Sequence, residues 1–385
     1  MQDTGFKPAD LLKKLIAFDT SNPPGKELEC AEYLAGILGE AGFETQIQLM
    51  PEDPGRANVI AAIGNPKGKK LIYNGHIDVV PASEGWTSDP FAAEIRDGRL
   101  YGRGACDMKG GVAAMSCAAA ALAKEGFHFD GGQLILVFVC DEELHDLGVK
   151  HYIQSEQFVK ADFAVISEPS SLCCCIAHRG VVRYRLSVLG RSCHAGVPQN
   201  GINAITNTGY AILALEELAK RVGARTHEVL PSPTLTMTMI SGGTKDNIVP
   251  GQVDISIDRR LLPDEDWESC MEEIREELES VRARVAGFDY RLEPYVSVNA
   301  GYIPPDSELV KICNRVFEET FGRKTVNRDF TGCNDQNFFV RAGVPTLVFG
   351  PGNLDQAHTV DEYVDVGELE QCTEFFYHLA KDILS

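Results

Sequence analysis

The chain has 385 residues, 44% of them hydrophobic and 24% charged, a composition typical of a soluble globular protein large enough for two domains. Its net charge of −20 argues against nucleic acid and anionic membranes as partners. No apolar run approaches the length needed to cross a bilayer, so the sequence predicts no membrane span.

The N-terminal segment MQDTGFKPADLLKKLIAF has acidic residues early and helical apolar spacing afterwards. This pattern predicts an amphipathic helix and not a secretion signal. Twelve cysteines without an export signal predict free thiols in a reducing, cytoplasmic compartment. No C-x-x-C pair is present, so a structural zinc site is not expected.

Residues 1–177 alternate between helical and extended patterns, which is typical of an α/β sheet with helices on its faces. Helices are predicted at Pro8–Asp19, Glu27–Ala41 and Lys109–Glu125, and strands at Asn58–Ile63, Lys70–Asn74, Gln133–Val139 and Phe163–Ile166. The same style returns near residue 299, with helices predicted at Ser307–Phe321 and Gly367–Leu384 and a strand at Val344–Phe349.

The segment 178–298 has a different pattern. Its predicted elements are strand Gly180–Leu189, helix Asn203–Val222, strands Thr234–Ile240 and Gln252–Arg260, helix Glu265–Arg284 and strand Asp289–Val298. This β-α-β-β-α-β order predicts a ferredoxin-like α+β domain with four strands and two helices on one face. We therefore expect a discontinuous first domain, residues 1–177 and 299–385, with residues 178–298 inserted as a second domain.

Acidic and histidine residues follow several apolar runs of the first domain. They are His76 and Asp78 in GHID, Asp107 in YGRGACDMKGG, Glu142 and Glu143 in VFVCDEEL, Glu168 in VISEPS, and His358 in DQAHTVDEYV. Ligands cluster at the carboxyl ends of strands in open α/β sheets, so these side chains are expected in one crevice. Imidazole and carboxylate groups are zinc ligands. The set therefore predicts a two-metal hydrolytic site.

Individual roles follow in part from local spacing. His76 and Asp78 share a strand face, so Asp78 suits the task of holding the other nitrogen of the imidazole. GRGACD superficially resembles a dinucleotide-binding turn, but Asp107 stands where that motif needs its last glycine, and its charge would repel pyrophosphate. A carboxylate at this turn can instead bridge two cations. Of the adjacent Glu142 and Glu143, one can bind metal while the other acts as a general base.

In this order, GHID, YGRGACDMKGG, DEE, SEPS, HAGVP and AHTVDEYV resemble the motifs of the co-catalytic zinc amidohydrolases. That family includes acetylornithine deacetylase, succinyl-diaminopimelate desuccinylase, aminoacylase and glutamate carboxypeptidase. The resemblance covers nearly the whole chain. It implies a mixed-sheet, zinc-peptidase-like catalytic domain, with the inserted domain acting as a lid that forms a homodimer.

The resemblance also implies a set of metal ligands. His76, Asp107 and Glu168 would bind one zinc ion, and Asp107, Glu143 and His358 the other, with cobalt or manganese as substitutes. Glu142 would be the general base and Asp78 the partner of His76. A cis peptide is implied after the bridging residue, between Asp107 and Met108.

In the inserted domain, the resemblance assigns three residues to the substrate. His194, in RSCHAGVPQNG, would reach the active site of the partner subunit and stabilise the developing oxyanion. Asn247, in DNIVPG, would contact the substrate, and Arg260, in DRRLLP, would clamp its carboxylate. A planar guanidinium binds a carboxylate through two hydrogen bonds, and the neighbouring Arg259 is expected to face the opposite side of the strand.

The predicted reaction is hydrolysis of the amide bond of an N-acyl amino acid. A dipeptidase or carboxypeptidase on the same scaffold is the nearest alternative, because a peptide is also an N-acyl amino acid. More distant alternatives are a non-catalytic binding protein that retains the fold and a cysteine-dependent hydrolase built on Cys193-His194. The segment TGCNDQNFF departs from the family at Cys333-Asn334, so the acyl group is left open.

Overall fold

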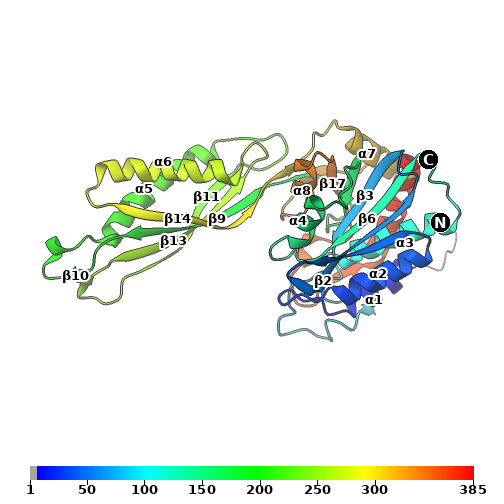
Figure 1. The fold of residues 1–385 in the computed structure, drawn as a ribbon, viewed down its shortest axis with the longest axis horizontal. Coiled ribbons are helices and arrows are strands. Elements are labelled where there is room, and N and C mark those ends of the chain that lie inside the picture. Colours follow the sequence, from blue (N-terminus) through cyan, green and yellow to red (C-terminus); the bar gives the residue numbers. More distant parts are fainter. Residues whose placement is uncertain (1–6) are drawn as a thin grey trace. The chain divides into compact units, whose positions relative to one another are not determined.

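The computed structural model describes residues 7–385 (Figure 1). Residues 1–6, with the acidic start of the predicted N-terminal helix, lie outside the described residues. The chain divides into two compact units, one formed by Met1–Ile176 and Tyr302–Ser385 and the other by Ala177–Gly301.

The largest sheet has nine strands in the order β1-β2-β6-β3-β7-β17-β8-β15, with β16 paired to β8. Its strands are β1 Glu44–Met50, β2 Asp53–Gly64, β3 Lys69–His76, β6 Gly132–Val139, β7 Phe163–Ile166, β8 Cys174–His178, β15 Gly301–Tyr302, β16 Asn327–Phe330 and β17 Thr346–Val348. β6, β3, β7 and β17 run parallel to one another, whereas the pairs β1–β2, β2–β6 and β17–β8 are antiparallel. The prediction of a mixed-sheet α/β fold is therefore confirmed.

Helices cover this sheet, and a small second sheet lies beside it. The helices are α1 Pro8–Ile16, α2 Leu28–Glu40, α3 Lys109–Lys124, α4 Leu147–Gln154, α7 Glu308–Phe321, α8 Gln336–Arg341 and α9 Val366–Leu384, with a 3-10 turn at Leu354–Gln356. The small sheet has the order β18-β5-β4, formed by Tyr363–Asp365, Arg99–Tyr101 and Glu94–Arg96. Among residues 7–385, no helix has both the length and the apolar character that a membrane span requires.

Helix α3, which begins two residues after Asp107, is buried over almost its whole length. Every residue from Lys109 to Leu122 is buried, and most are glycine or alanine. These small side chains let α3 pack between α1 and α9 and close to the sheet. A Cβ atom added at Gly111 would lie 2.1 Å from the carbonyl oxygen of Ser167, just after β7. The glycine therefore permits the start of α3, and the loop before it, to approach the end of β7.

The second unit contains an antiparallel four-stranded sheet in the order β11-β13-β9-β14. Its elements in chain order are β9 Gly180–Leu189, α5 Ala204–Gly223, β11 Thr234–Gly242, β13 Gln252–Leu261, α6 Trp267–Arg284 and β14 Asp289–Val298. This is the predicted β-α-β-β-α-β order, and α5 and α6 pack on the sheet around a common apolar core. Side-chain caps fix both helix starts, from Asn203 to α5 and from Asp266 to α6.

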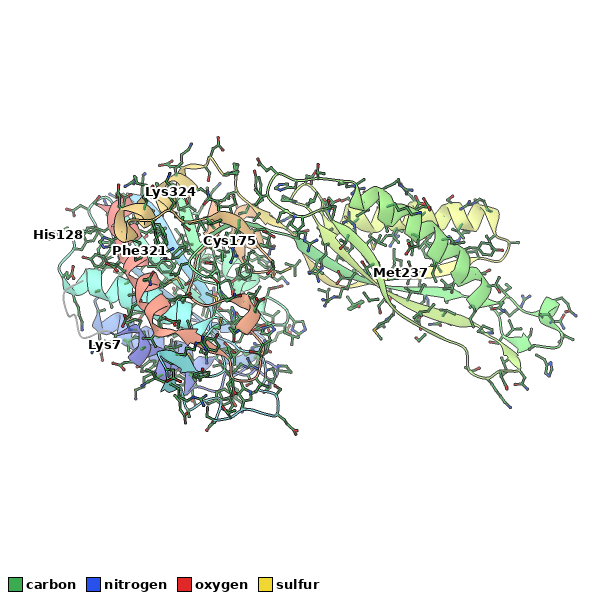
Figure 2. All side chains as sticks on the ribbon, turned by 180° about the vertical axis from the view of Figure 1, so that it is seen from behind. Lys7, His128, Cys175, Met237, Phe321 and Lys324 are labelled. Atoms are coloured by element: carbon green, nitrogen blue, oxygen red, sulfur yellow. The ribbon has the colours of Figure 1, made fainter. Side chains whose placement is uncertain are left out.

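A short ribbon that the sequence did not predict extends this unit. It pairs β10 Cys193–His194 with β12 Ile248–Val249, and a 3-10 turn follows at Pro198–Asn200. On the main sheet, Met237 of β11 packs partly buried against the apolar core (Figure 2).

Candidate active site

The carboxyl ends of neighbouring parallel strands bring most of the predicted site residues of the first unit together. His76 is the last residue of β3, Glu142 and Glu143 follow β6, and Glu168 follows β7. His358 lies in the loop after β17, with a φ of 61° in the left-handed region. Asp107 lies two residues before the start of α3, and the peptide bond between Asp107 and Met108 is cis, as the resemblance implies.

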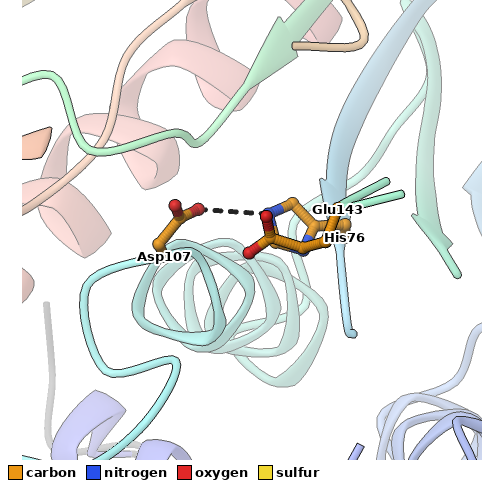
Figure 3. A group of neighbouring side chains, drawn as sticks. All are labelled: His76, Asp107 and Glu143. Atoms are coloured by element: carbon orange, nitrogen blue, oxygen red, sulfur yellow. Dashed lines mark hydrogen bonds and ion pairs between the residues drawn. The ribbon is translucent and has the colours of Figure 1, made fainter. Parts of the chain in front are cut away.

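The carboxylate of Asp107 lies between two histidines. Its Oδ1 is 3.1 Å from Nε2 of His76 (Figure 3). Its Oδ2 is 3.3 Å from Nε2 of His358. Glu168 approaches Nε2 of His76 to 3.7 Å, and Glu143 approaches Nε2 of His358 to 3.0 Å. Asp107 therefore joins two groups of side chains, one around His76 and one around His358.

These side chains suit two divalent cations. Ligand atoms of His76, Asp107 and Glu143 lie within 4.8 Å of one another, and imidazole nitrogen with carboxylate oxygen is a donor set that zinc accepts. Two cations close together need a bridging carboxylate to offset their mutual repulsion. The two oxygens of Asp107, each facing a different histidine, fit that requirement.

The electrostatics of the site favour positive charge. Burial alone would lower the pKa of His76, but the hydrogen bond to Asp107 and the nearby carboxylates raise it well above its usual range. The hydrogen bonds to Asp107 and Glu143 raise the pKa of His358 to about 10. Burial opposes ionisation of Asp107, yet its contacts with both histidines keep its pKa below the ordinary value. Without metal, protons on the two imidazoles balance the negative charge of the carboxylates. Bound cations can take the place of these protons.

Glu142 stands at the edge of this cluster, with Oε2 4.0 Å from Nε2 of His76. Burial raises its pKa well above the usual range, and the negative charges of Glu168 and Glu143 add to the effect. A further acidic group, which the sequence analysis missed, brings ligand atoms of Glu142, Asp146 and Asp335 within 4.8 Å of one another. A carboxyl group with a raised pKa is suited to accept a proton and donate it again near neutral pH.

Asp78 lies beside His76 as expected, but its carboxylate has a different main contact. Nδ1 of His76 is 2.9 Å from the backbone carbonyl oxygen of Asp78 and 3.6 Å from its carboxylate. The carboxylate accepts hydrogen bonds from the backbone N–H groups of Glu142, at 3.1 Å, and Glu143, at 3.2 Å. The carbonyl therefore orients the imidazole, while the carboxylate holds the loop after β6.

Glu362 is a second buried carboxylate that the sequence analysis missed. Its Oε1 accepts the N–H groups of Cys106, at 2.8 Å, and Asp107, at 3.0 Å. Its Oε2 accepts the N–H of Gly104, at 3.0 Å, and a guanidinium N–H of Arg103, at 2.5 Å. The one available signal was its place in AHTVDEYV, four residues after His358.

The predicted substrate residues of the second unit fall into two places. The β10–β12 ribbon pairs His194 with Ile248, and the carbonyl of Asn247 accepts the N–H of Ala195 at 2.9 Å, so His194 and Asn247 are neighbours. Both are exposed. The ribbon strand β12 ends three residues before Gln252, the first residue of β13. Arg260 lies near the other end of β13, eight residues of extended strand away, which is a distance of roughly 26 Å from Gln252. The second unit of one chain therefore does not bring Arg260 to His194.

The contacts of Cys193 do not form a thiol–imidazole pair. Its Sγ contacts the backbone carbonyl oxygens of His194 and Val197, each at 3.5 Å. Nδ1 of His194 accepts the N–H of Gly196 at 2.9 Å. These contacts give no support to a cysteine-dependent hydrolase, which needs the imidazole to activate the thiol.

The model of peptidase family M20/M25/M40 matches residues 72–382. The chain belongs to peptidase family M20/M25/M40. Among curated relatives, acetylornithine deacetylase of Proteus mirabilis is 33% identical over 358 residues, covering 91% of this chain and 88% of the relative. Among solved structures, aminopeptidase PepT of Bacillus cereus superposes with a TM-score of 0.82 at 20% identity and covers 98% of both chains. YXEP of Bacillus subtilis, a dinuclear metal-binding peptidase of the M20 family, gives a TM-score of 0.74 at 17% identity, covering 98% of this chain and 97% of that chain.

Membership of family M20/M25/M40 confirms the resemblance seen in the sequence. The protein is a metal-dependent hydrolase of the deacylase and peptidase class, as the sequence predicts. The mixed α/β fold is that of the M20 structures. A dinuclear metal centre accords with the family and with the convergent side chains around Asp107.

Proposed function

We propose that this M20 family protein hydrolyses the amide bond of small N-acyl amino acids, as a deacetylase or desuccinylase. The observation that carries the proposal is the bridging position of Asp107, with Oδ1 3.1 Å from His76 and Oδ2 3.3 Å from His358. The similarity to acetylornithine deacetylase, over 91% of the chain, supports an acyl amino acid as the substrate.

In this proposal, His76, Asp107 and Glu168 would hold one zinc ion, and Asp107, Glu143 and His358 would hold the other. Cobalt or manganese can take the place of zinc, because nitrogen- and oxygen-rich sites accept all three. When bound, the two ions supply Lewis acidity that polarises the amide carbonyl and makes water more acidic.

Glu142 moves the proton in the proposed reaction. Its carboxylate accepts a proton from the attacking water and later delivers that proton to the nitrogen of the leaving amine. The pKa of Glu142, raised first by burial and then by neighbouring carboxylates, suits a group that must hold the proton between these two steps. Asp78 supports Glu142 by accepting the N–H of its backbone.

His194, Asn247 and Arg260 bind and orient the substrate. An imidazole N–H of His194 stabilises the developing oxyanion, Asn247 contacts the substrate from the same ribbon, and the guanidinium of Arg260 pairs with the substrate carboxylate. The length of β13 between Arg260 and the ribbon supports an arrangement in which two chains contribute to each site, with His194 and Asn247 supplied by the partner.

A homodimer follows from this arrangement. β11 is an edge strand of the four-stranded sheet, and its side chains Met239 and Ile240 are 71% and 61% exposed. On the adjacent helix α5, Leu213 is 68% exposed. An apolar edge strand is a template for pairing with another chain, so this surface supports contact with a second copy.

We also propose that the protein works in the reducing cytoplasm. All twelve cysteines are free thiols, which is the usual state in a reducing compartment. Most are buried; Cys175, for example, lies inside the first unit, and burial raises the pKa of its thiol to about 12 (Figure 2).

A substrate panel tests the proposed function. The purified protein is stripped of metal and assayed with N-acetyl, N-succinyl and N-formyl amino acids and with dipeptides, before and after zinc is added back. Zinc-dependent cleavage of one acyl class supports the proposal and names the substrate. Cleavage of dipeptides alone assigns the protein to the peptidases of the family, and no cleavage of any member contradicts the proposal.

A further inference from the structure

The loop between α1 and α2 lies along the segment that follows β3. The N–H of Val79 donates to the carbonyl of Thr20 at 3.1 Å, and the N–H of Asn22 donates to the carbonyl of Val79 at 2.8 Å. The hydroxyl of Thr20 donates to the carbonyl of Ile77 at 2.7 Å. These bonds fix the loop against the residues immediately after His76.

Asn22 uses this position to join two buried carboxylates. Its Nδ2 donates one hydrogen bond to Oδ2 of Asp78, at 2.9 Å, and another to Oδ1 of Asp141, at 2.8 Å. Both acids are fully buried, and Asn22 itself is 4% exposed. Two buried carboxylates that accept hydrogen bonds from the same nitrogen atom are close enough to repel each other. The primary amide of Asn22 is uncharged and has two N–H donors, so it can bond both carboxylates at once. Among residues 7–385, its buried Oδ1 has no hydrogen-bond partner, so the amide is held through its NH₂ end.

Both carboxylates control the loop that carries Glu142 and Glu143. Asp78 accepts the backbone N–H groups of these two residues, at 3.1 and 3.2 Å. Asp141 directly precedes them and has a φ of 63°, a left-handed conformation that a side chain disfavours. Such a conformation persists only where surrounding contacts hold it. Asn22 supplies one of these contacts at Asp141.

Arg56 completes the support from the other side. Its Nη1 donates to Oδ1 of Asp141 at 2.7 Å, and its Nη2 donates to the buried Glu27 at 2.7 Å. The charge of Asp141 is therefore paired with Arg56, while Asp78 lies 3.6 Å from the imidazole of His76 and accepts a hydrogen bond from the uncharged amide of Asn22. Asn22 is thus the link between the two acids, and Arg56 neutralises one of them.

We propose that Asn22 is a positioning residue, which sets where the carboxylates of Glu142 and Glu143 stand by holding Asp78 and Asp141 together. The side chain of Asn22 donates its hydrogen bonds to Asp78 and Asp141 and not to the two glutamates, so it acts through the backbone that carries them. This inference rests on the proposed function of Glu142 as the base and Glu143 as a metal ligand.

A graded series of variants tests the proposal. Asn22→Ser keeps one donor and Asn22→Ala keeps none, whereas the wild type has two. We expect kcat to fall in the order Asn, Ser, Ala, by about 10–100-fold for the alanine variant, with KM changed less than threefold, since outer contacts of metal sites have effects of this size. Asn65→Ala is the matched control, because the amide of Asn65 also makes two hydrogen bonds, one donated to the carbonyl of Asp130 and one accepted from the N–H of Lys67, in an exposed loop.

The second readout is metal affinity, measured by calorimetric titration of the metal-free variants with zinc. Displacement of Glu143 should weaken one of the two binding events in the same order, by about 10-fold or more for Asn22→Ala. Unchanged kcat and unchanged affinity in a folded Asn22→Ala variant overturn the proposal. If that variant does not fold, Asn22→Ser decides, and wild-type values for it overturn the proposal equally. A wild-type protein that cleaves no N-acyl substrate contradicts the proposed function instead, while the metal titration still tests Asn22.

Discussion

The carboxylate of Glu362 holds the backbone of Asp107, with Oε1 3.0 Å from the backbone nitrogen of that residue. Within residues 7–385, this carboxylate accepts hydrogen bonds from three backbone N–H groups and from the guanidinium of Arg103. Glu362 and Arg103 are both almost completely buried, so the pair is protected from water. The position of the bridging carboxylate is therefore fixed by a second acid that binds no metal in our proposal.

Replacement Glu362→Gln is expected to weaken metal binding while conserving side-chain size. A glutamine amide keeps one acceptor oxygen and replaces the other with an NH₂ donor, so two of the four buried donors lose their acceptor. We expect zinc affinity to fall by about 10–100-fold and the thermal midpoint to fall as well. Titration calorimetry and thermal unfolding measure both. A variant with wild-type zinc affinity would show that Asp107 keeps its place without Glu362.

Replacement Glu142→Gln is expected to abolish most turnover and leave the metals bound. The amide cannot accept the proton from water, and the loss of a general base costs roughly 10²–10⁴-fold in kcat. Zinc content is measured on the same preparation by elemental analysis. A kcat near that of the wild type, with two metals bound, would remove Glu142 from the mechanism.

The affinity of the metal-free protein for zinc is expected to rise with pH. Hydrogen bonds to Asp107 and Glu143 keep His358 protonated up to about pH 10, and His76 is also held protonated above its usual range. Metal binds neutral imidazole and must displace these protons. Calorimetry near neutral pH, in buffers of different ionisation enthalpy, should detect release of more than one proton per chain.

The same pKa shift fixes the sign of the pH dependence of stability in the metal-free protein. Because the folded pKa of His358, about 10, exceeds its unfolded value of about 6.5, its contribution is complete below pH 6.5 and is lost as pH rises through 10. The thermal midpoint of the metal-free protein should therefore fall across that window. A midpoint that rises between these pH values would contradict the assignment.

The neighbours Arg259 and Arg260 should give opposite phenotypes. Arg259 is fully buried, and its Nη2 lies 2.7 Å from Glu265. Replacement Arg259→Met should therefore destabilise the fold, but by less than the about 3–5 kcal/mol of a wholly broken buried pair, because Arg225 still pairs with Glu265. Arg260 is half-buried and bonds Asp258 at 2.8 Å, so Arg260→Met should raise KM with little change in thermal midpoint. Equal effects of the two replacements on stability would argue against the substrate role of Arg260.

Replacement Ile240→Glu is expected to shift the protein from dimer to monomer. A charge on an exposed edge strand opposes pairing with a second strand. Val326→Glu is the matched control, since Val326 is 59% exposed in the first unit and Ile240 is 61% exposed in the second. Light scattering after size-exclusion chromatography gives the mass of each. A dimeric Ile240→Glu variant would move the proposed interface away from β11.

The sequence predicted the elements that have strong local patterns. Strand β7 and strand β14 have the predicted bounds, and the metal-ligand candidates on β3 and β6 lie at strand ends as expected. Apolar periodicity reports which face of an element is buried, and this information is local. The parallel strands then meet at one edge, which is why a list of short motifs could describe most of the site.

The supporting contacts of the site could not be predicted in this way. Asn22 contacts Asp141 across 119 positions, and Glu362 contacts Asp107 across 255. Neither pair leaves a periodic pattern, because each depends on how separate loops fold against the sheet. The further contacts of Asp78 were missed for the same reason: its carboxylate, 3.6 Å from Nδ1 of His76, also accepts the backbone N–H groups of Glu142 and Glu143 after β6.

The close approach of Gly111 to Ser167 limits which substitutions near the site the fold can accept. Even a methyl group at position 111 would collide with a backbone carbonyl that cannot rotate away. The spacing between Asp107 and Glu168 is thus set by a helix–sheet contact, and changes in loop sequence alone cannot adjust it. New metal preference or substrate range in such a scaffold is therefore easier to reach through the second unit and the outer loops than through the start of α3.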